Sequence, residues 1–335
     1  MLVRKSVLFC LLSLVMQCLC AQNVDYSVVS VPEEKGLDFM QVTTPNDYVY
    51  MPTVKRSSLP FVKSSKNNLS WLSGRVIDVS ADGKSIAYIS ERNKETNVFI
   101  KELGKQGGSI QRTNRSNIVD FSYSPDGTLI CFSEKRGNTN QIFQTSATSG
   151  YSCRQITSGN QDYSPVYSSD MKHIFFSRQE RNNFSIWSYD IQNNFLSNYT
   201  GGINPYPILK TNSFFCSRMN VEGRGEIWRI NYETGVEESI ISDRDRSFTS
   251  PTVSPDGEWI MFVGSSKVSI NPKSTYMNLD VFVARVDGRD FTQITYHAAD
   301  DLSPTWSKDG NYIYFISQRG NMEGIANIWR VNFNR

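Results

Sequence analysis

A four-residue sequence, Ser-Pro-Asp-Gly, recurs along this chain about every 44 residues, in intact and degraded copies. Serine at the first place, proline at the second, aspartate at the third and a glycine free to adopt positive φ at the fourth suit a type I turn. Each copy therefore predicts a tight hairpin between two strands. The copies are Ser80–Gly83, Ser124–Gly127, Ser168–Met171, Ser254–Gly257 and Ser307–Gly310, with a worn copy at Lys210–Asn212.

Strand-like segments follow the turns in a fixed order. A nearly continuous apolar run comes first, which is typical of a strand buried on both faces. About ten residues later comes a triplet of a polar, a β-branched and an aromatic residue, and an Ile-Thr ending such as Gln155–Thr157 or Gln293–Thr295 closes most units. The apolar runs are Ser85–Ile89, Leu129–Phe132, His173–Phe176, Ser213–Cys216, Trp259–Val263 and Tyr312–Ile316, and the triplets are Asn97–Phe99, Gln141–Phe143, Ser185–Trp187, Glu226–Trp228, Asp280–Phe282 and Asn327–Trp329.

Six antiparallel units of four strands, without helical periodicity, predict an all-β fold, a six-bladed β-propeller. A closed ring leaves no open sheet edge. The last repeat ends after its third strand, so we expect an N-terminal segment to supply the missing outer strand. Phe39–Thr43 is one candidate, because Pro52–Val54 follows it at the interval that separates Gln293–Thr295 from Pro304–Trp306, and Asn67–Ser70 is a second.

The N-terminal residues predict export from the cytoplasm. Arg4 and Lys5 precede an apolar core from Val7 to Met16 and a small Ala21, which is typical of a secretory signal peptide. The predicted organisation is a signal peptide at 1–21, an extension at 22–60 that supplies a closing strand, and the propeller at 61–335. Lipidation at Cys18 or Cys20 stays open. Removing the signal takes 35 Lys and Arg to 33 against 33 Asp and Glu, a balance that does not favour nucleic acid.

Three cysteines remain in the predicted mature chain: Cys131, Cys153 and Cys216. An odd number cannot form a complete disulfide set. Cys131 and Cys216 lie in apolar runs, which favours small buried hydrophobic residues. A bridge between Cys131 and Cys153 within one blade is the alternative.

The repeated turn, the Ser-x-Arg segments at Ser90–Arg92 and Ser317–Arg319, the Ile-Trp pairs and the Ile-Thr endings resemble the WD40-like (PD40) propeller repeat of the TolB family, over about residues 75–335. In that family the propeller is a periplasmic protein-binding module that docks a peptidoglycan-associated lipoprotein. TolB proteins carry an α/β domain ahead of the propeller, and residues 22–60 are too few for one. The chain looks more like the propeller-only envelope proteins of Bacteroidetes-type bacteria. The resemblance implies a non-enzymatic periplasmic scaffold that is not transmembrane and takes an envelope protein, such as a peptidoglycan-associated lipoprotein, as its partner.

Catalytic motifs are scarce. The chain has no Gly-x-Ser-x-Gly nucleophile elbow, which propeller-bearing peptidases place in a hydrolase domain. With only His173 and His297, a histidine-rich metal centre of the oligogalacturonate lyase type cannot form, so we expect no metal and no cofactor. His297 does share a loop with Asp300 and Asp301, where it would hold a cation or act as a base. A glycan-binding or glycan-processing propeller with a site at the channel mouth is therefore the alternative function.

Propeller geometry predicts two different faces. The connections between blades and the loops between second and third strands share one face, and the Ser-Pro-Asp-Gly turns lie on the other. An arginine follows the second strand in most blades (Arg92, Arg136, Arg178, Arg218 and Arg319), and we interpret it first as structural. The fifth repeat carries an insertion that we expect to contact a partner, with Lys267, Lys273, Tyr276 and Met277. The predicted channel-mouth binding residues are Arg75, Arg115, Asp162, Asn204, Arg244, Arg246, His297, Asp300 and Asp301.

Overall fold

A computed structural model describes residues 26–52, 74–105, 107–149, 152–181, 183–271, 274–320 and 325–334, and of residues 267–271 and 274–277 it describes the backbone. The predicted signal segment and the candidate closing strand Asn67–Ser70 lie outside these ranges. The described chain is all-β, apart from two three-residue 3₁₀ helices, η1 (Pro32–Glu34) and η2 (Pro45–Asp47). Within these ranges, no helix has the length and apolar character needed to cross a membrane.

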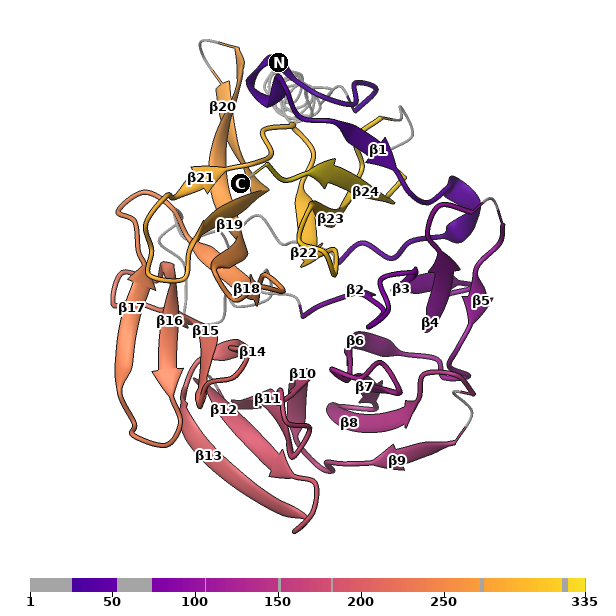
Figure 1. The fold of residues 1–335 in the computed structure, drawn as a ribbon, viewed down its shortest axis with the longest axis vertical. Coiled ribbons are helices and arrows are strands. Elements are labelled where there is room, and N and C mark those ends of the chain that lie inside the picture. Colours follow the sequence, from indigo (N-terminus) through magenta and orange to yellow (C-terminus); the bar gives the residue numbers. More distant parts are fainter. Residues whose placement is uncertain are drawn as a thin grey trace, which may run out of the picture.

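The strands form four sheets of four strands and one of eight in the described chain. Figure 1 shows them arranged around a common centre, with the first strand of each group innermost. The groups are β2 (Ile77–Val79), β3 (Ser85–Arg92), β4 (Glu95–Glu102) and β5 (Ile110–Gln111); β6 (Ile118–Tyr123), β7 (Leu129–Arg136), β8 (Thr139–Ser146) and β9 (Cys153–Gln155); β10 (Gln161–Tyr167), β11 (His173–Glu180), β12 (Asn183–Asp190) and β13 (Phe195–Gly201); β14 (Ile203–Pro207), β15 (Ser213–Met219), β16 (Gly225–Asn231) and β17 (Glu237–Ile241); β18 (Phe248–Val253), β19 (Trp259–Asn271), β20 (Ser274–Arg285) and β21 (Thr292–Gln293); and β22 (Asp301–Trp306), β23 (Tyr312–Ser317) and β24 (Asn327–Asn332) with β1 (Phe39–Gln41).

Two pairings join segments that do not follow one another in a single repeat. The eight-stranded sheet consists of the β6–β9 and β10–β13 groups, joined by one parallel pair, Gln161 with Asn140. β1 runs antiparallel to β24, with Phe39 opposite Val331 and Gln41 opposite Trp329. The last sheet therefore takes its outer strand from the N-terminal part of the chain.

The Ser-Pro-Asp-Gly turns have the predicted geometry. In the first copy the Gly83 N–H donates to the Ser80 carbonyl at 2.9 Å, and Gly83 has a φ of 70°. The Asp82 carboxylate accepts from the Ser80 hydroxyl at 2.7 Å and from the Lys84 N–H at 3.0 Å, so it fixes both sides of the turn. The worn copy differs, because its turn begins at Ile208, whose carbonyl accepts from Thr211, and Lys210 takes the positive φ.

The apolar runs form the core between neighbouring sheets. Phe248, Phe262 and Phe282 are fully buried and pack edge-on or stacked at centroid distances of 5.3 to 6.2 Å. Cys131 and Cys216 are buried, as predicted, and Cys153 is partly exposed. None of the three forms a disulfide, so the alternative of a Cys131–Cys153 bridge is wrong. The insertion in the fifth repeat lengthens β19 and β20 into one hairpin that pairs from Trp259–Arg285 to Asn271–Ser274.

Candidate functional site

A repeated proline bulge shapes the innermost strands. In β10, β14, β18 and β22 a serine or asparagine with positive φ precedes a proline, and the strand register shifts at that point. Proline cannot donate to a ladder, so it is tolerated where the ladder is interrupted. The four pairs are Ser164–Pro165, Asn204–Pro205, Ser250–Pro251 and Ser303–Pro304.

These bulges line a small cavity at the centre of the fold. The central cavity, whose wall includes Gly74, Phe121 and the four bulges, has a volume of about 30 Å³. That is enough for one or two water molecules and too small for a sugar ring. Arg75 is also part of the wall; its guanidinium lies 4.7 Å from the ring centroid of Tyr206, and its Nη1 lies 3.4 Å from Asp78 Oδ2.

Asp120 is a buried acid beside this cavity. Its carboxylate accepts from the Ser133 hydroxyl at 2.6 Å and from the Ser164 N–H at 2.9 Å, so it joins β6, β7 and β10. Burial raises the pKa of Asp120 to about 6, although both hydrogen bonds and the Arg75 charge act in the opposite direction.

Several predicted mouth residues are held in internal contacts. Arg115 pairs with Glu134, and Asp162 forms a buried ion pair with Arg178, whose Nε lies 2.7 Å from Asp162 Oδ1. Asn204 donates to Thr249 and Ser250 and accepts from Ser164. These side chains hold neighbouring strands and connections together.

Four of the five repeated arginines stack on an aromatic side chain of the third strand, and Arg319 stacks on Phe39 and Phe315 instead. The Arg178 guanidinium lies 4.5 Å from the Trp187 ring centroid, and Arg218 lies 4.9 Å from that of Trp228. Arg218 also pairs with Glu237, whose pKa that ion pair lowers to about 2. A planar guanidinium favours this combination of stacking and bidentate pairing, which supports the structural interpretation of these arginines.

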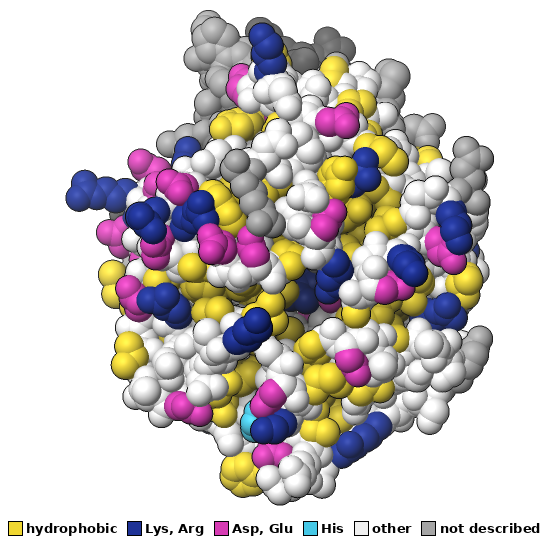
Figure 2. Space-filling model, viewed as in Figure 1, with side chains coloured by type: hydrophobic (Ala, Val, Ile, Leu, Met, Phe, Trp, Pro, Cys, Tyr) yellow, Lys and Arg dark blue, Asp and Glu magenta, His cyan; other side chains and the backbone are white. Residues whose placement is uncertain are grey.

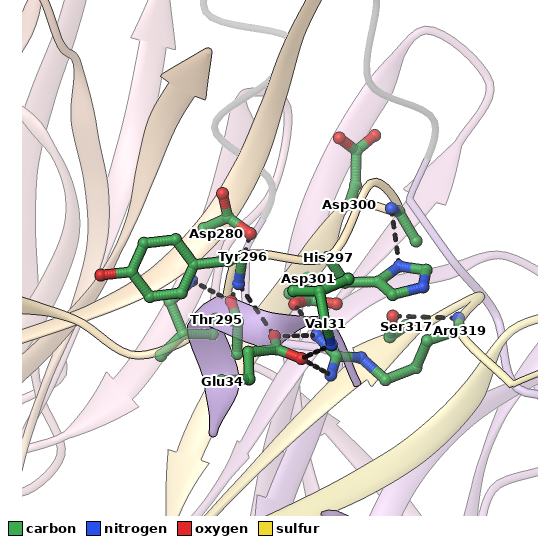
Figure 3. A network of polar contacts seen from close by, with 12 residues as sticks. Val31, Glu34, Asp280, Thr295, Tyr296, His297, Asp300, Asp301, Ser317 and Arg319 are labelled. Carbon is green, nitrogen blue, oxygen red and sulfur yellow. Dashed lines mark hydrogen bonds and ion pairs between the residues drawn. The ribbon is translucent and has the colours of Figure 1, made fainter. Parts of the chain in front are cut away.

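The most buried polar network lies where η1 meets the last two sheets (Figure 3). Arg319 and Glu34 are 0% and 1% exposed. Arg319 Nη2 donates to Glu34 Oε1 at 3.1 Å and to Asp301 Oδ2 at 2.6 Å, and Nη1 donates to Glu34 Oε2 at 3.2 Å and to the Val29 carbonyl at 3.0 Å. Glu34 also accepts from the Tyr296 N–H at 2.9 Å. The network therefore fixes the N-terminal segment to the β21–β22 connection.

Asp280 and Asp300 lie beside this network. Burial raises the pKa of Asp301, with Arg319 opposing it, and burial followed by the nearby Asp301 charge raises the pKa of Asp280 well above its usual range. Asp300 accepts from the Leu279 N–H at 3.1 Å. His297 is fully buried and its Nδ1 accepts from the Ala299 N–H at 2.9 Å, a structural contact. Among the described residues, no group of three or more His, Cys, Asp or Glu side chains is arranged to hold a metal ion.

Exposed side chains gather on the face that carries the connections between groups and the loops between second and third strands. Val221 is fully exposed and Met219 is 38% exposed, both near the β15–β16 loop. That loop contacts the next connection directly, because the Gly225 N–H donates to the Ser247 hydroxyl at 2.8 Å. The connection carries exposed Arg244 and half-buried Arg246. The β19–β20 hairpin extends from the neighbouring sheet, with Lys267, Tyr276 and Met277 in its strands, while Lys273 lies outside the described residues.

Sequence reasoning did not find the apolar part of this surface. Val221 and Met219 are not part of the repeated motif, and only their solvent exposure, which the sequence does not show, marks them as surface residues. Glu34 was also missed, because its partner Arg319 lies 285 residues away. No repeat position or local motif marks Glu34, so the sequence carries no signal for this contact.

The family comparison agrees with this architecture. The family model described as TolB beta propeller domain matches residues 77–213. The chain has a TolB-like β-propeller. A solved structure of TolB from Acinetobacter baumannii is 18% identical, with a TM-score of 0.59, over 75% of this chain and 64% of that one. The TolB-like propeller thus spans less than two thirds of the Acinetobacter protein.

Other solved structures share the fold. A protein assigned as TolB from Agrobacterium tumefaciens is 18% identical, with a TM-score of 0.57, over 78% of this chain and 90% of that one. An oligogalacturonate lyase from Vibrio parahaemolyticus is 10% identical, with a TM-score of 0.56, over 89% of this chain and 97% of that one. At these identities the likeness shows the fold alone. None of the curated proteins matches the TolB-like propeller.

Proposed function

We propose that the chain is an exported, periplasmic β-propeller of the cell envelope that binds another envelope protein through its loop-bearing face and catalyses no reaction. The N-terminal signal-like sequence and the TolB-like domain support the location. The partner would be an envelope protein of the peptidoglycan-associated lipoprotein type, as the TolB resemblance implies.

The proposal includes a closed ring of six blades. Four sheets contain four strands each, and the eight-stranded sheet divides into two groups of four that share one parallel pair. The β1–β24 pairing supplies the outer strand of the last group. A ring closed in this way protects its sheet edges and leaves loops to make the contacts.

One observation carries the functional choice: the central cavity has room for water only, at about 30 Å³. The acids nearest the mouth are used internally, since Asp162 pairs with Arg178 and Asp301 pairs with Arg319. A catalytic or saccharide site needs free polar groups around a pocket of ligand size. These contacts instead support a surface that works by docking.

The exposed loops have a composition that suits a protein partner. Met219 and Val221 provide apolar area, and Arg244 and Arg246 lie on the connection that contacts their loop. Methionine and arginine are enriched at protein interfaces. On the opposite face, which carries the turns and is drawn in Figure 2, basic and acidic side chains are interspersed, an arrangement unlike the basic stripe of a nucleic-acid-binding surface. We include the hairpin residues Lys267, Lys273, Tyr276 and Met277 in the docking surface.

The test compares two exposed valines. Val221→Asp changes the proposed surface, and Val236→Asp, at the β16–β17 turn, changes a second exposed valine that lies outside it and is 62% exposed. Envelope proteins captured by each purified variant are identified by mass spectrometry, and the affinity of the main partner is then measured by biolayer interferometry. We expect Val221→Asp to weaken binding at least tenfold and Val236→Asp to leave it unchanged. Deleting Ser266–Thr275 should also weaken it without unfolding the ring.

Two outcomes would overturn the proposal. Equal capture by both valine variants would place the contact elsewhere. Specific binding of acidic oligosaccharides on a glycan array, with no protein partner captured, would favour the glycan-binding alternative that the likeness to oligogalacturonate lyase suggests.

A further inference from the structure

A groove lies on the face that carries the Ser-Pro-Asp-Gly turns, opposite the loop-bearing face. It has a volume of about 670 Å³ and lies between the β2–β5 and β6–β9 groups, which are neighbours in Figure 1. Pockets that hold small molecules or short peptide segments usually measure about 300–1,000 Å³. This groove is therefore large enough for a ligand, in contrast to the central cavity.

Arg112 supplies an uncompensated positive charge to the groove. Its Nη1 donates to the Thr148 carbonyl at 3.2 Å, and its Nε is buried without a hydrogen-bond partner among the described residues. No carboxylate in the described chain pairs with it, whereas Arg115 and Arg178 each have one. A guanidinium held in this way is ready to bind a carboxylate with two N–H groups.

The groove also offers apolar and neutral polar surface beside Arg112. Ile110 is 56% exposed, and Ile100 lies next to it across the β4–β5 pair. Tyr123 lines the same groove and is 8% exposed. An aliphatic side chain would bury area against the two isoleucines while a neighbouring acid reached Arg112.

The rim of the groove is held in place before any ligand binds. Lys101 Nζ donates to the Gly107 carbonyl at 2.8 Å and lies 3.2 Å from Asp47 Oδ2. Tyr88 and Ser109 bond to each other and to the same carboxylate. These contacts hold Gly107 and Ser109 in place, so a ligand loses little affinity to ordering this part of the rim.

The three acids in the wall already have partners within the protein: Glu102 pairs with Lys105, and the other two bond within the turns. Asp82 accepts from Ser80 and Lys84, and Asp126 accepts from Ser124 and Thr128. Lys84 also lines the groove, as does Lys105 with its Glu102 partner. Among these cations Arg112 is the one closest to the exposed Ile110 in the sequence, so a carboxylate on Arg112 would have an apolar neighbour.

We propose that this groove binds a peptide segment of a partner in which an acidic residue lies next to an aliphatic one, with the carboxylate on Arg112 and the aliphatic side chain on Ile100 and Ile110. The inference is independent of the docking surface on the loop-bearing face. It gives the ring a second point of attachment on its other side.

The test uses isoleucine methyl NMR of the whole mature protein. The probes are acetyl-Glu-Leu-amide and its neutral analogue acetyl-Gln-Leu-amide. We expect saturable shifts of the Ile100 and Ile110 methyl signals, with the acidic probe binding about tenfold more tightly. In Arg112→Gln the two probes should bind alike. Arg289→Gln, which changes an arginine whose side chain is 79% exposed and which pairs with Asp287, should keep the preference.

Three results would contradict the proposal. These are an absence of shifts at Ile100 and Ile110 at saturating probe concentrations, equal binding of both probes to the unaltered protein, and a preference for the acidic probe that survives in Arg112→Gln. The remaining methyl signals report whether each variant is folded.

Discussion

Replacing Asp120 by asparagine should change how the stability of the ring depends on pH. The carboxyl group is buried and accepts hydrogen bonds from Ser133 and Ser164, and burial raises its pKa to about 6. Asparagine has nearly the same shape and does not titrate. Comparing the two proteins therefore isolates the contribution of this one acid.

Because the pKa of Asp120 is raised in the folded state, the stability that this group contributes falls as the pH rises. Because the pKa is about 6 in the folded state and about 3.9 in an unfolded chain, the contribution of Asp120 to stability is complete below about pH 4 and is lost as the pH rises through 6. The full loss is about 3 kcal/mol, and about 2 kcal/mol of it falls between pH 4.5 and 7.5. Asp120→Asn should thus cost about 2 kcal/mol less at pH 7.5 than at pH 4.5.

Urea unfolding followed by tryptophan fluorescence at pH 4.5, 6.0 and 7.5 measures this difference directly. Asp245→Asn, in an exposed loop, is the control for replacing a surface aspartate by asparagine. An equal cost of Asp120→Asn at all three values, or a larger cost at pH 7.5, would refute the reasoning, because Asp120 would then be ionised throughout.

Two further substitutions and one control test contacts between different elements of the fold. Arg319→Met leaves Glu34 and Asp301 buried without their cation, so the free energy of unfolding should fall by about 3–5 kcal/mol; a fall below about 1 kcal/mol in urea unfolding would contradict the buried network. A Cβ on Gly225 would lie 2.5 Å from the Phe248 carbonyl oxygen, so Gly225→Ala should destabilise by about 1–3 kcal/mol in thermal unfolding. Gly201→Ala meets only an ordinary contact at 3.8 Å and should be close to neutral.

The turns and strands were predictable because their causes are local. The Asp82 carboxylate bonds to Ser80 and to the Lys84 N–H, all within five residues, so the sequence carries the whole turn. The apolar runs after the turns were buried as expected. The outer strand at Phe39–Gln41 was one of two candidates, and only the pairing with β24 distinguishes it.

The candidate site was less predictable, because charge type does not reveal charge pairing. Asp162 and Asp301 were predicted at the channel mouth, and the structure gives each a buried arginine partner 16 or 18 residues away. Ser164 and Asn204 take positive φ before proline, a conformation that the alternation of a strand pattern does not indicate. Such details depend on how neighbouring sheets meet.

The pairing of β1 with β24 has a consequence for a chain that has been cut. Three residues of β1 pair with three residues of β24, about 290 positions later in the chain, and Glu34 bonds to Arg319. Segments near both ends of the described chain are therefore held in one sheet. Proteolysis of a single surface loop would then open the polypeptide without separating it into two bodies. The two fragments would migrate together on a sizing column and part only in denaturant.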